Sequence, residues 1–198
     1  MSVPYYRAAY NLRSALESSG IHHSWLVTEG ESHVTRARNN LAATFLTQTD
    51  YQTLAFIDSD IEMDPDDFML LLDQPGVRGA AVATKTPDFS ECLSVFVSGI
   101  RPKRSEMPVQ SFQVDYLGSA VLFIDRDVFE RLKASELVSE YTDPIIGQAW
   151  DFFRDGVSGD NWLSEDYGFC DLCNEAGIPV LCDPSVIVKH YGVACWSF

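Results

Sequence analysis

The sequence lacks the features that would insert a protein into a membrane or export it. None of its apolar runs approaches the roughly eighteen residues that a membrane-spanning helix needs. The first residues, MSVPYYRAAYNLR, contain no apolar core of the kind that signal peptides carry. We therefore expect an intracellular protein of the cytoplasm, with no membrane span.

Positive charge is scarce as well. The chain has 14 lysines and arginines against 29 aspartates and glutamates, which gives a formal net charge of −15. A surface this acidic repels phosphate backbones, so a nucleic-acid partner is not expected. A nucleotide is still compatible with this charge, because a divalent cation can bridge carboxylates and phosphates.

The cysteines do not form a disulfide or zinc pattern. Their number is odd, and they stand at Cys92, Cys170, Cys173, Cys182 and Cys195. An odd count without a secretion signal is typical of reduced thiols. One CxxC is present, but the paired CxxC spacing of structural zinc sites is missing. We interpret Cys170 and Cys173 as small apolar residues on one helix face.

Short apolar runs alternate with helical patterns along the whole chain, and no repeat or linker interrupts them. The predicted strands are residues 24–28, 53–58, 79–84, 116–124, 179–183 and 186–190. The predicted helices are residues 4–20, 35–48, 64–73, 127–135 and 165–177. This alternation predicts one α/β domain over residues 1–198, with a mostly parallel sheet flanked by helices. Since a helical pattern begins almost at once, the opening strand of such a domain is short or missing.

The stretch LAFIDSDIEMDPDD, residues 54–67, concentrates six acids behind an apolar run. Asp64 before Pro65 matches an N-cap followed by proline at the first helical position, with two acids in the first turn. The start of a helix thus explains Asp64, Asp66 and Asp67, and it leaves Asp58, Asp60 and Glu62 without an explanation. Of these, Asp58 follows the apolar strand directly. In an extended chain Asp58 and Asp60 would point to the same side of a strand end, where a pair of carboxylates suits Mg²⁺ or Mn²⁺.

A second stretch, LFIDRDVF at residues 122–129, has nearly the same form and serves as a comparison. There Asp127 is well placed to cap the helix that follows, and Arg126 puts a positive charge between the two acids. We interpret this copy as structural. In the first copy the middle residue is the small Ser59, and Asp60 is not needed as a cap.

Five segments in order, spanning about residues 31–192, resemble the GT-A fold nucleotide-sugar glycosyltransferases, closest to small members from phages and large DNA viruses. The segments are ESHVTRARNNLAATFL, LAFIDSDIEMDPDDF, VDYLGSAVLFIDRDVFERL, NWLSEDYGFCDLCNEAGIPVLCDP and VKHYG. The resemblance implies a GT-A-like (Rossmann-like) domain, with a donor half at about residues 1–85 and an acceptor half at about residues 86–198. For a viral protein, the expected location is the cytoplasm of the host.

The resemblance also implies a donor and metal site. Asp58, Ser59 and Asp60 would form the D-x-D motif, with Asp60 on the metal and Asp58 on the donor ribose or the waters of the metal. His190 of HYG would be a further metal ligand, although a lone histidine at a strand end is more often structural. Arg38 and Asn39 would lie near the nucleotide or its diphosphate. Arg36 is interpreted as solvated. Lys85, just past a strand end, is a weaker candidate for a phosphate contact, and its interpretation as an ordinary surface lysine is favoured. The cofactor would be Mn²⁺ or Mg²⁺, and the donor a UDP- or GDP-sugar.

The SEDYGF stretch supplies the catalytic candidates that the resemblance implies. Asp166 is the first choice for the general base of an inverting reaction, and Glu165 is the alternate. Both acids also suit the first turn of a helix capped by Ser164. Trp162 and Trp150 are candidates for stacking on an acceptor sugar.

The sequence therefore predicts a metal-dependent transfer of a sugar from a nucleoside-diphosphate sugar to a hydroxyl of a glycan or other acceptor. The alternative is a degenerate relative that binds a sugar or a partner without turnover. A nucleotidyltransferase is disfavoured because no glycine-rich phosphate loop stands early in the chain.

Overall fold

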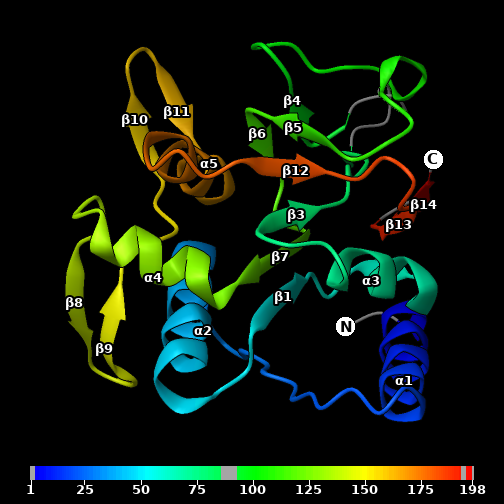
Figure 1. Ribbon diagram of the computed structural model, residues 1–198, viewed down its shortest axis with the longest axis horizontal. Helices are drawn as coiled ribbons and strands as arrows, with labels where there is room; N and C mark the ends of the chain where they lie inside the picture. Colours follow the sequence, from blue (N-terminus) through cyan, green and yellow to red (C-terminus); the bar gives the residue numbers. More distant parts are fainter. Residues whose placement is uncertain (1–2, 86–92, 193–194, 198) are drawn as a thin grey trace.

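A computed structural model gives the fold of the chain and describes residues 3–85, 93–192 and 195–197. The architecture is mixed α/β, with helices on both faces of a central sheet (Figure 1). Within the described residues, no helix is long and apolar enough to cross a membrane. Ser2 and Cys92, which entered the sequence predictions, lie outside the described residues.

The helices lie close to where the sequence patterns predict them. They are α1 (Val3–Ser18), α2 (Val34–Gln48), α3 (Pro65–Leu72), α4 (Arg126–Ala134), α5 (Glu165–Glu175) and the short 3-10 helix η1 (Arg104–Glu106). The start of α3 is as predicted, since the Asp64 side chain accepts a hydrogen bond of 2.9 Å from the backbone N–H of Asp66.

The predicted cap of α4 is wrong by two residues. Asp125 is the N-cap residue and Asp127 lies in the first turn, where its charge complements the helix dipole. The Asp125 carboxylate accepts hydrogen bonds from Thr53 at 2.8 Å and from Arg78, a side chain buried beneath it. The Arg126 guanidinium donates to backbone carbonyls at the end of α2, including Thr49 at 2.7 Å. This copy of the acidic motif thus connects elements of the core, as predicted, but not by a cap at Asp127.

The central sheet differs from the predicted, mostly parallel one. In the described part of the chain it has five strands in the order β1-β7-β3-β12-β5. Of their four pairings only β3–β12 is parallel, and the other three are antiparallel. Strands β1, β3 and β12 run in one direction. Strand β7, between β1 and β3, and strand β5, beside β12, run in the opposite direction. The strands are β1 (Thr53–Ile57), β3 (Val77–Gly79), β5 (Phe112–Val114), β7 (Val121–Asp125) and β12 (Val180–Cys182).

Smaller sheets and hairpins surround the central one. The three-stranded sheet β14-β13-β2 places the end of the chain beside the segment that follows β1. The long stretch 136–163 forms two hairpins rather than an irregular loop. These strands are β2 (Ile61–Met63), β4 (Val95–Phe96), β6 (Tyr116–Leu117), β8 (Glu140–Asp143), β9 (Gly147–Trp150), β10 (Gly156–Ser158), β11 (Asn161–Leu163), β13 (Val188–Tyr191) and β14 (Cys195–Ser197).

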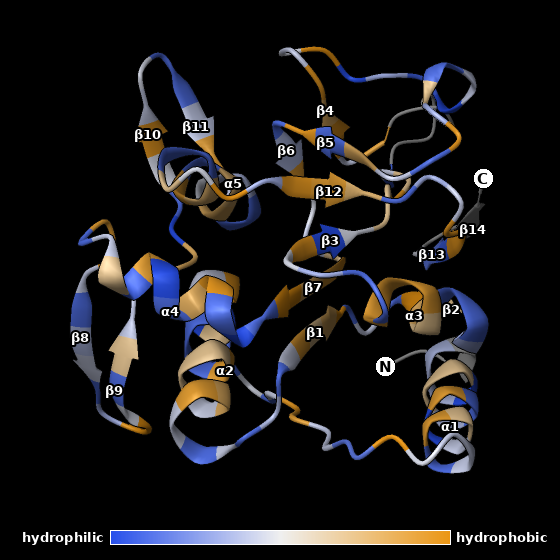
Figure 2. Ribbon diagram, in the orientation of Figure 1, coloured by the Kyte–Doolittle hydropathy of each residue, from blue (hydrophilic) through white to orange (hydrophobic). Residues whose placement is uncertain are grey.

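Two hydrophobic layers hold the central sheet, one on each face. Along β7 the side chains of Leu122 and Ile124 enter the layer packed by α2, α4 and α5, whereas Phe123 enters the layer packed by α1 and α3. This two-residue alternation follows from the pleat of a strand. Figure 2 shows hydrophobic residues concentrated along these strands.

The predicted strand at residues 24–28 is wrong. This segment crosses from α1 to α2 without strand pairing, and Trp25, Leu26 and Val27 are 40%, 40% and 59% exposed. Its apolar run satisfies the local pattern of a strand, but β1 forms its ladder with β7 alone. The predicted strand at 116–124 also divides, into β6 and β7.

Candidate functional site

A cleft lies where the chain leaves the carboxyl end of β1. Its volume is about 190 Å³. The residues that line it are Val34, Arg38, Asp58, Val82, Ala83, Thr84, Ser94, Gly118, Ser119, Ala120, Glu165, Asp166 and His190. Residues from widely separated parts of the sequence thus meet at the strand end where α/β sheets place ligands.

The D-x-D segment is a tight turn and not an extended strand end. The N–H of Ile61 donates to the carbonyl of Asp58 at 3.0 Å, which closes the turn before β2. The extended geometry predicted that the two carboxylates point to the same side. In the turn they have different partners instead, so this prediction is wrong. Asp58 reaches Arg38, Asp60 reaches Lys85 and His190, and Ser59 is exposed at the tip.

Arg38 is the buried centre of charge in the cleft. Its side chain is 7% exposed and lies over the ring of Phe56, with 5.2 Å between guanidinium carbon and ring centre. It donates to Asp58 at 3.0 Å and to Glu165 at 3.2 Å. One guanidinium thus holds the start of α5 against the end of β1, and stabilises two carboxylates in a partly desolvated place.

The acidic pair at the start of α5 is divided between two environments. Burial raises the pKa of the Glu165 carboxyl, the charge of Asp166 raises it further, and Arg38 partly offsets both. Asp166 also lines the cleft, and one of its oxygens accepts from the Ser164 hydroxyl and the Tyr167 N–H. Ser164 is the N-cap residue, but its hydroxyl bonds Asp166 and not a backbone N–H.

Asp60 is flanked on both carboxylate oxygens. Lys85 donates to one oxygen, and the Nε2 atom of His190 lies 3.5 Å from the other. The backbone also joins these elements, since the N–H of Tyr191 donates to the carbonyl of Asp60 at 2.8 Å. Lys85 is an exposed lysine, as the favoured interpretation had it, but its ammonium is paired with Asp60. Its position just after a buried apolar run was the available signal.

The orientation of His190 fits a metal ligand. Its Nδ1 donates to the carbonyl of Ala83 at 2.7 Å, since that oxygen can only accept. Nε2 is thereby left facing Asp60, which is how proteins orient a metal-binding imidazole. Among the described residues no group of three or more acids, histidines and cysteines meets at one point, and Asp58 is paired with Arg38. Asp60 and His190 fit a cation that keeps open positions for waters and phosphates.

Asn39 and Arg36 serve the fold instead of the cleft. The Asn39 amide donates to the carbonyl of Phe153 and accepts from its N–H, both at 2.8 Å. Arg36 pairs with Asp143 at 3.0 Å, so it is not merely solvated. The Asn39 amide is thus bound to the backbone of Phe153, and Asn39 is not among the residues that line the cleft.

The two candidate tryptophans are in different settings. Trp162 on β11 is 68% exposed and pairs across the hairpin with Val157, which is 76% exposed. This hairpin leads directly into Ser164 and α5, whose first two residues, Glu165 and Asp166, line the cleft. Trp150 is 6% exposed and packs in the core beside Phe152. Of the two rings, that of Trp162 is the exposed one.

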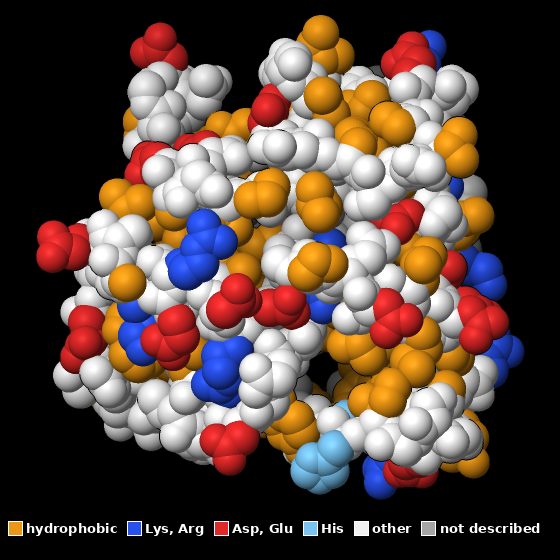
Figure 3. All heavy atoms as spheres, in the orientation of Figure 1, with side chains coloured by type: hydrophobic (Ala, Val, Ile, Leu, Met, Phe, Trp, Pro, Cys, Tyr) orange, Lys and Arg blue, Asp and Glu red, His pale blue; other side chains and the backbone are white. Residues whose placement is uncertain are grey.

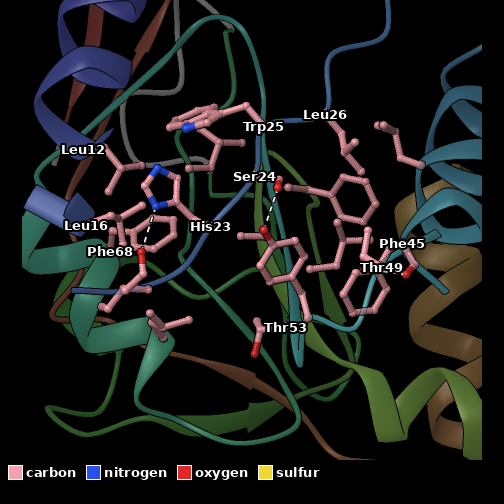
Figure 4. A pocket seen from close by; sticks show the side chains of 18 of the residues that line it. Leu12, Leu16, His23, Ser24, Trp25, Leu26, Phe45, Thr49, Thr53 and Phe68 are labelled. Atoms are coloured by element: carbon pink, nitrogen blue, oxygen red, sulfur yellow. Dashed lines mark hydrogen bonds between the residues drawn. The ribbon is translucent and has the colours of Figure 1, made fainter. Parts of the chain in front are cut away.

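A second cavity, of about 220 Å³, lies along the free edge of β1. It is mainly apolar, and all five residues of β1 line it together with parts of α1, α2 and the segment 21–26. In Figure 4, Trp25 and Leu26 lie above it, with Phe45 and Thr49 on one side and Leu12 and Leu16 on the other. Figure 3 shows the molecule in the orientation of Figure 1. An opening is visible in the lower part of this view, near hydrophobic and histidine side chains. Sequence reasoning did not predict this cavity.

The cysteines of α5 and β12 belong to the core. Cys170, Cys173 and Cys182 are free and buried within the hydrophobic layer. Burial raises the pKa of the Cys170 and Cys182 thiols to about 12. The burial of Cys170 and Cys173 in this layer agrees with their interpretation as apolar residues of one helix.

Comparison with known proteins adds a fold but no family. No family model matches the chain, and no curated protein matches its sequence. Among solved structures, the crystal structure of A197 from STIV aligns with a TM-score of 0.57 and 21% sequence identity. The alignment covers 92% of this chain and 78% of that one. The chain thus shares its mixed α/β fold with that protein, and at this identity the likeness shows the fold alone.

Proposed function

We propose that the protein is a metal-dependent glycosyltransferase, which moves a sugar from a nucleoside-diphosphate sugar to a hydroxyl of a glycan or other acceptor. One observation carries the proposal. Arg38, Asp58, Asp60, Asp166 and His190 come from four separate segments and meet at one strand end. This set supplies cation ligands and a general base around a cleft, which are the groups that such a transfer requires.

The donor would bind through its diphosphate. Carboxylates and phosphates repel each other, so a cation has to lie between them, and Asp60 and His190 are the residues that would hold it. Bound there, Mn²⁺ or Mg²⁺ would offset the charge that develops on the leaving diphosphate. Arg38 keeps Asp58 in place at the edge of the cleft, where that carboxylate can contact the ribose or metal-bound water.

Asp166 is the better of the two candidate bases. Both carboxyl groups line the cleft, but Glu165 is paired with the Arg38 guanidinium, whereas the bonds to Asp166 come from its chain neighbours Ser164 and Tyr167. In the proposed step the acceptor oxygen forms a bond to the anomeric carbon, and the bond from that carbon to the diphosphate oxygen breaks. The hydroxyl proton passes to Asp166, and the configuration of the sugar inverts.

The acceptor would approach over the β10–β11 hairpin. Exposed aromatic rings bind the apolar faces of sugars, and Trp162 offers such a ring three residues before Glu165, where α5 begins. Its neighbour Val157 extends the apolar surface across the hairpin.

The test is a calorimetric titration of UDP and of GDP, with and without Mn²⁺, on the wild type, Asp60→Ala and Asp127→Ala. We expect one nucleotide to bind only with Mn²⁺, and we expect Asp60→Ala alone to abolish that binding. Asp127→Ala is the matched control, because it stands in the second copy of the motif, in the first turn of α4. Loss in Asp127→Ala with retention in Asp60→Ala would refute the site.

A second assay separates transfer from binding without turnover. Release of the nucleoside diphosphate from UDP- or GDP-sugars, with water or added glycans as acceptors, should fall at least about a hundredfold in Asp166→Asn. Nucleotide binding should persist in the same variant, since Asp166 does not contact Asp60 or His190 among the interactions that the structure describes. Binding without any release in the wild type would indicate the degenerate alternative.

A further inference from the structure

Both carboxylate oxygens of Asp60 already face a nitrogen before any cation binds. Lys85 donates to Oδ2, and the Nε2 atom of His190 lies 3.5 Å from Oδ1. The side chains of Asp60 and Lys85 are 37% and 35% exposed, so water and ions reach the pair. The ammonium of Lys85 therefore satisfies the carboxylate that the proposed function assigns to the metal.

A divalent cation and the Lys85 ammonium compete for this carboxylate. Both are compact, strongly hydrated charges that prefer hard oxygen ligands. Held a few ångströms apart they would also repel each other, and the repulsion is larger near a protein surface than in bulk water. Binding of the cation to Asp60 thus favours departure of Lys85.

The two nitrogen partners of Asp60 differ in how firmly they are held. His190 is fixed, because its ring bonds the carbonyl of Ala83 at 2.7 Å and the backbone of Tyr191 bonds Asp60. Lys85 ends on a flexible four-carbon stem whose ammonium can turn to another anion within reach. The donor diphosphate, placed at the same cation, is such an anion.

We propose that Lys85 is an exchangeable counter-ion of Asp60. Without a cation it neutralises the carboxylate, and when Mn²⁺ or Mg²⁺ binds, the released ammonium pairs with a phosphate oxygen of the donor. The inference rests on the proposed function. It adds a binding order, in which the cation displaces Lys85 from Asp60 and the ammonium then binds the nucleotide. Lys85 would thus lower the affinity for the cation alone and raise the affinity for the nucleotide.

The experiment measures two affinities in Lys85→Met, whose side chain keeps the stem and removes the charge. The first is the affinity for Mn²⁺ alone, followed by electron paramagnetic resonance of free Mn²⁺. The second is the affinity for UDP and GDP at saturating Mn²⁺, followed by calorimetry. We expect Mn²⁺ to bind about tenfold more tightly, because a neighbouring positive charge is gone. The nucleotide should bind about tenfold more weakly, because a charge-assisted hydrogen bond is lost.

Lys189→Met is the matched control. Lys189 lies one residue before His190 and forms a comparable ion pair, with 2.6 Å between its Nζ and Glu62, on the other side of β13. It should change neither affinity. Changes of opposite sign in Lys85→Met alone support the proposal, since a structural role would weaken both affinities together.

Two outcomes overturn the inference, and they are distinguishable. If the wild type shows Mn²⁺-dependent nucleotide binding but Lys85→Met leaves Mn²⁺ affinity unchanged or lower, the counter-ion role is wrong and the proposed function stands. If neither protein binds Mn²⁺ or a nucleotide, the proposed function fails and the inference fails with it. Mn²⁺ binding seen only in Lys85→Met would support the competition directly.

Discussion

Replacing Arg38 by methionine tests the charge balance at the centre of the cleft. Methionine fills a similar space along the stem but removes the guanidinium that joins Asp58 to Glu165. The Asp58 side chain is 40% exposed and can be hydrated, whereas the Glu165 side chain is 13% exposed. Most of the cost therefore falls on Glu165. We expect Arg38→Met to lower the free energy of unfolding by about 3 kcal/mol at neutral pH, the lower end for breaking a buried pair.

The pH dependence of this loss has a definite sign. Burial and Asp166 raise the pKa of Glu165 above 4.5, and Arg38 lowers it, so the variant raises that pKa further. A carboxyl with a higher pKa in the folded state holds its proton longer there than in the unfolded chain. The free energy of unfolding then falls as the pH rises from the ordinary pKa through the raised one. The deficit of Arg38→Met should be small near about pH 4 and reach its full size near about pH 7.

Urea unfolding at both pH values, followed by tryptophan fluorescence, measures the effect. Arg13→Met is the control, since Arg13 and Glu17 form an exposed pair with side chains 63% and 56% exposed. It should leave the free energy of unfolding nearly unchanged at both pH values, because water screens the pair. Adding Glu165→Gln to Arg38→Met should recover more than half of the loss, because no uncompensated charge stays buried. An equal deficit at both pH values, or no recovery, would refute the electrostatic explanation.

Three further predictions concern the supports of the site. Gly168→Ala should destabilise the protein by about 2 kcal/mol or more in thermal unfolding, since a Cβ there would lie 2.0 Å from the carbonyl oxygen of Arg154; unchanged stability would contradict the close approach. Asp125→Ala should cost about 3 kcal/mol in urea unfolding, because it strands the buried Arg78, and Asp127→Ala less than about 1 kcal/mol; equal losses would contradict the assignment. Trp162→Ala should leave stability and nucleotide binding unchanged but weaken transfer to glycans by about tenfold or more, measured as an increase in KM for the acceptor; an unchanged KM would remove the ring from the acceptor surface.

The helices were more predictable than the strands, for a local reason. Each helix depends on contacts three and four residues apart and on its own first turn, as the Asp64 cap of α3 shows. A strand needs a partner strand, and the residues of the strand itself do not indicate which segment that partner is. The segment 24–28 has the apolar pattern of a strand, but it has no strand partner and stays irregular.

Strand direction was also beyond the sequence. The alternation of strands and helices led to a mostly parallel sheet, but β7 runs antiparallel between β1 and β3. A continuous apolar run predicts only that a strand is buried on both faces, and β7 fulfils this in either direction.

The candidate site shows the same division between residue type and geometry. The sequence pointed to Asp58, Asp60, Glu165, Asp166 and His190. Four of them line one cleft, and Asp60 lies next to it, 3.5 Å from the Nε2 atom of His190. Asn39 and Trp150 were chosen by type as well, but backbone hydrogen bonds and core packing occupy them. Lys85 was only a weak candidate, and the ion pair that it forms joins it to Asp60, which is 25 residues away in the sequence.

The sequence by itself determined which chemistry this protein can carry. Its acids, its scarcity of positive charge and its helix starts follow from residue identity and from neighbours within a turn of chain. Only the tertiary structure decided which carboxylate meets which nitrogen-bearing side chain. Arg38 and Glu165 are 127 residues apart in the sequence, and Asp60 lies in the turn after β1 whereas His190 lies in β13. Ion pairs and metal ligands act over a few ångströms, and only the packing of α2, α5 and β13 around the end of β1 brings these groups within that distance.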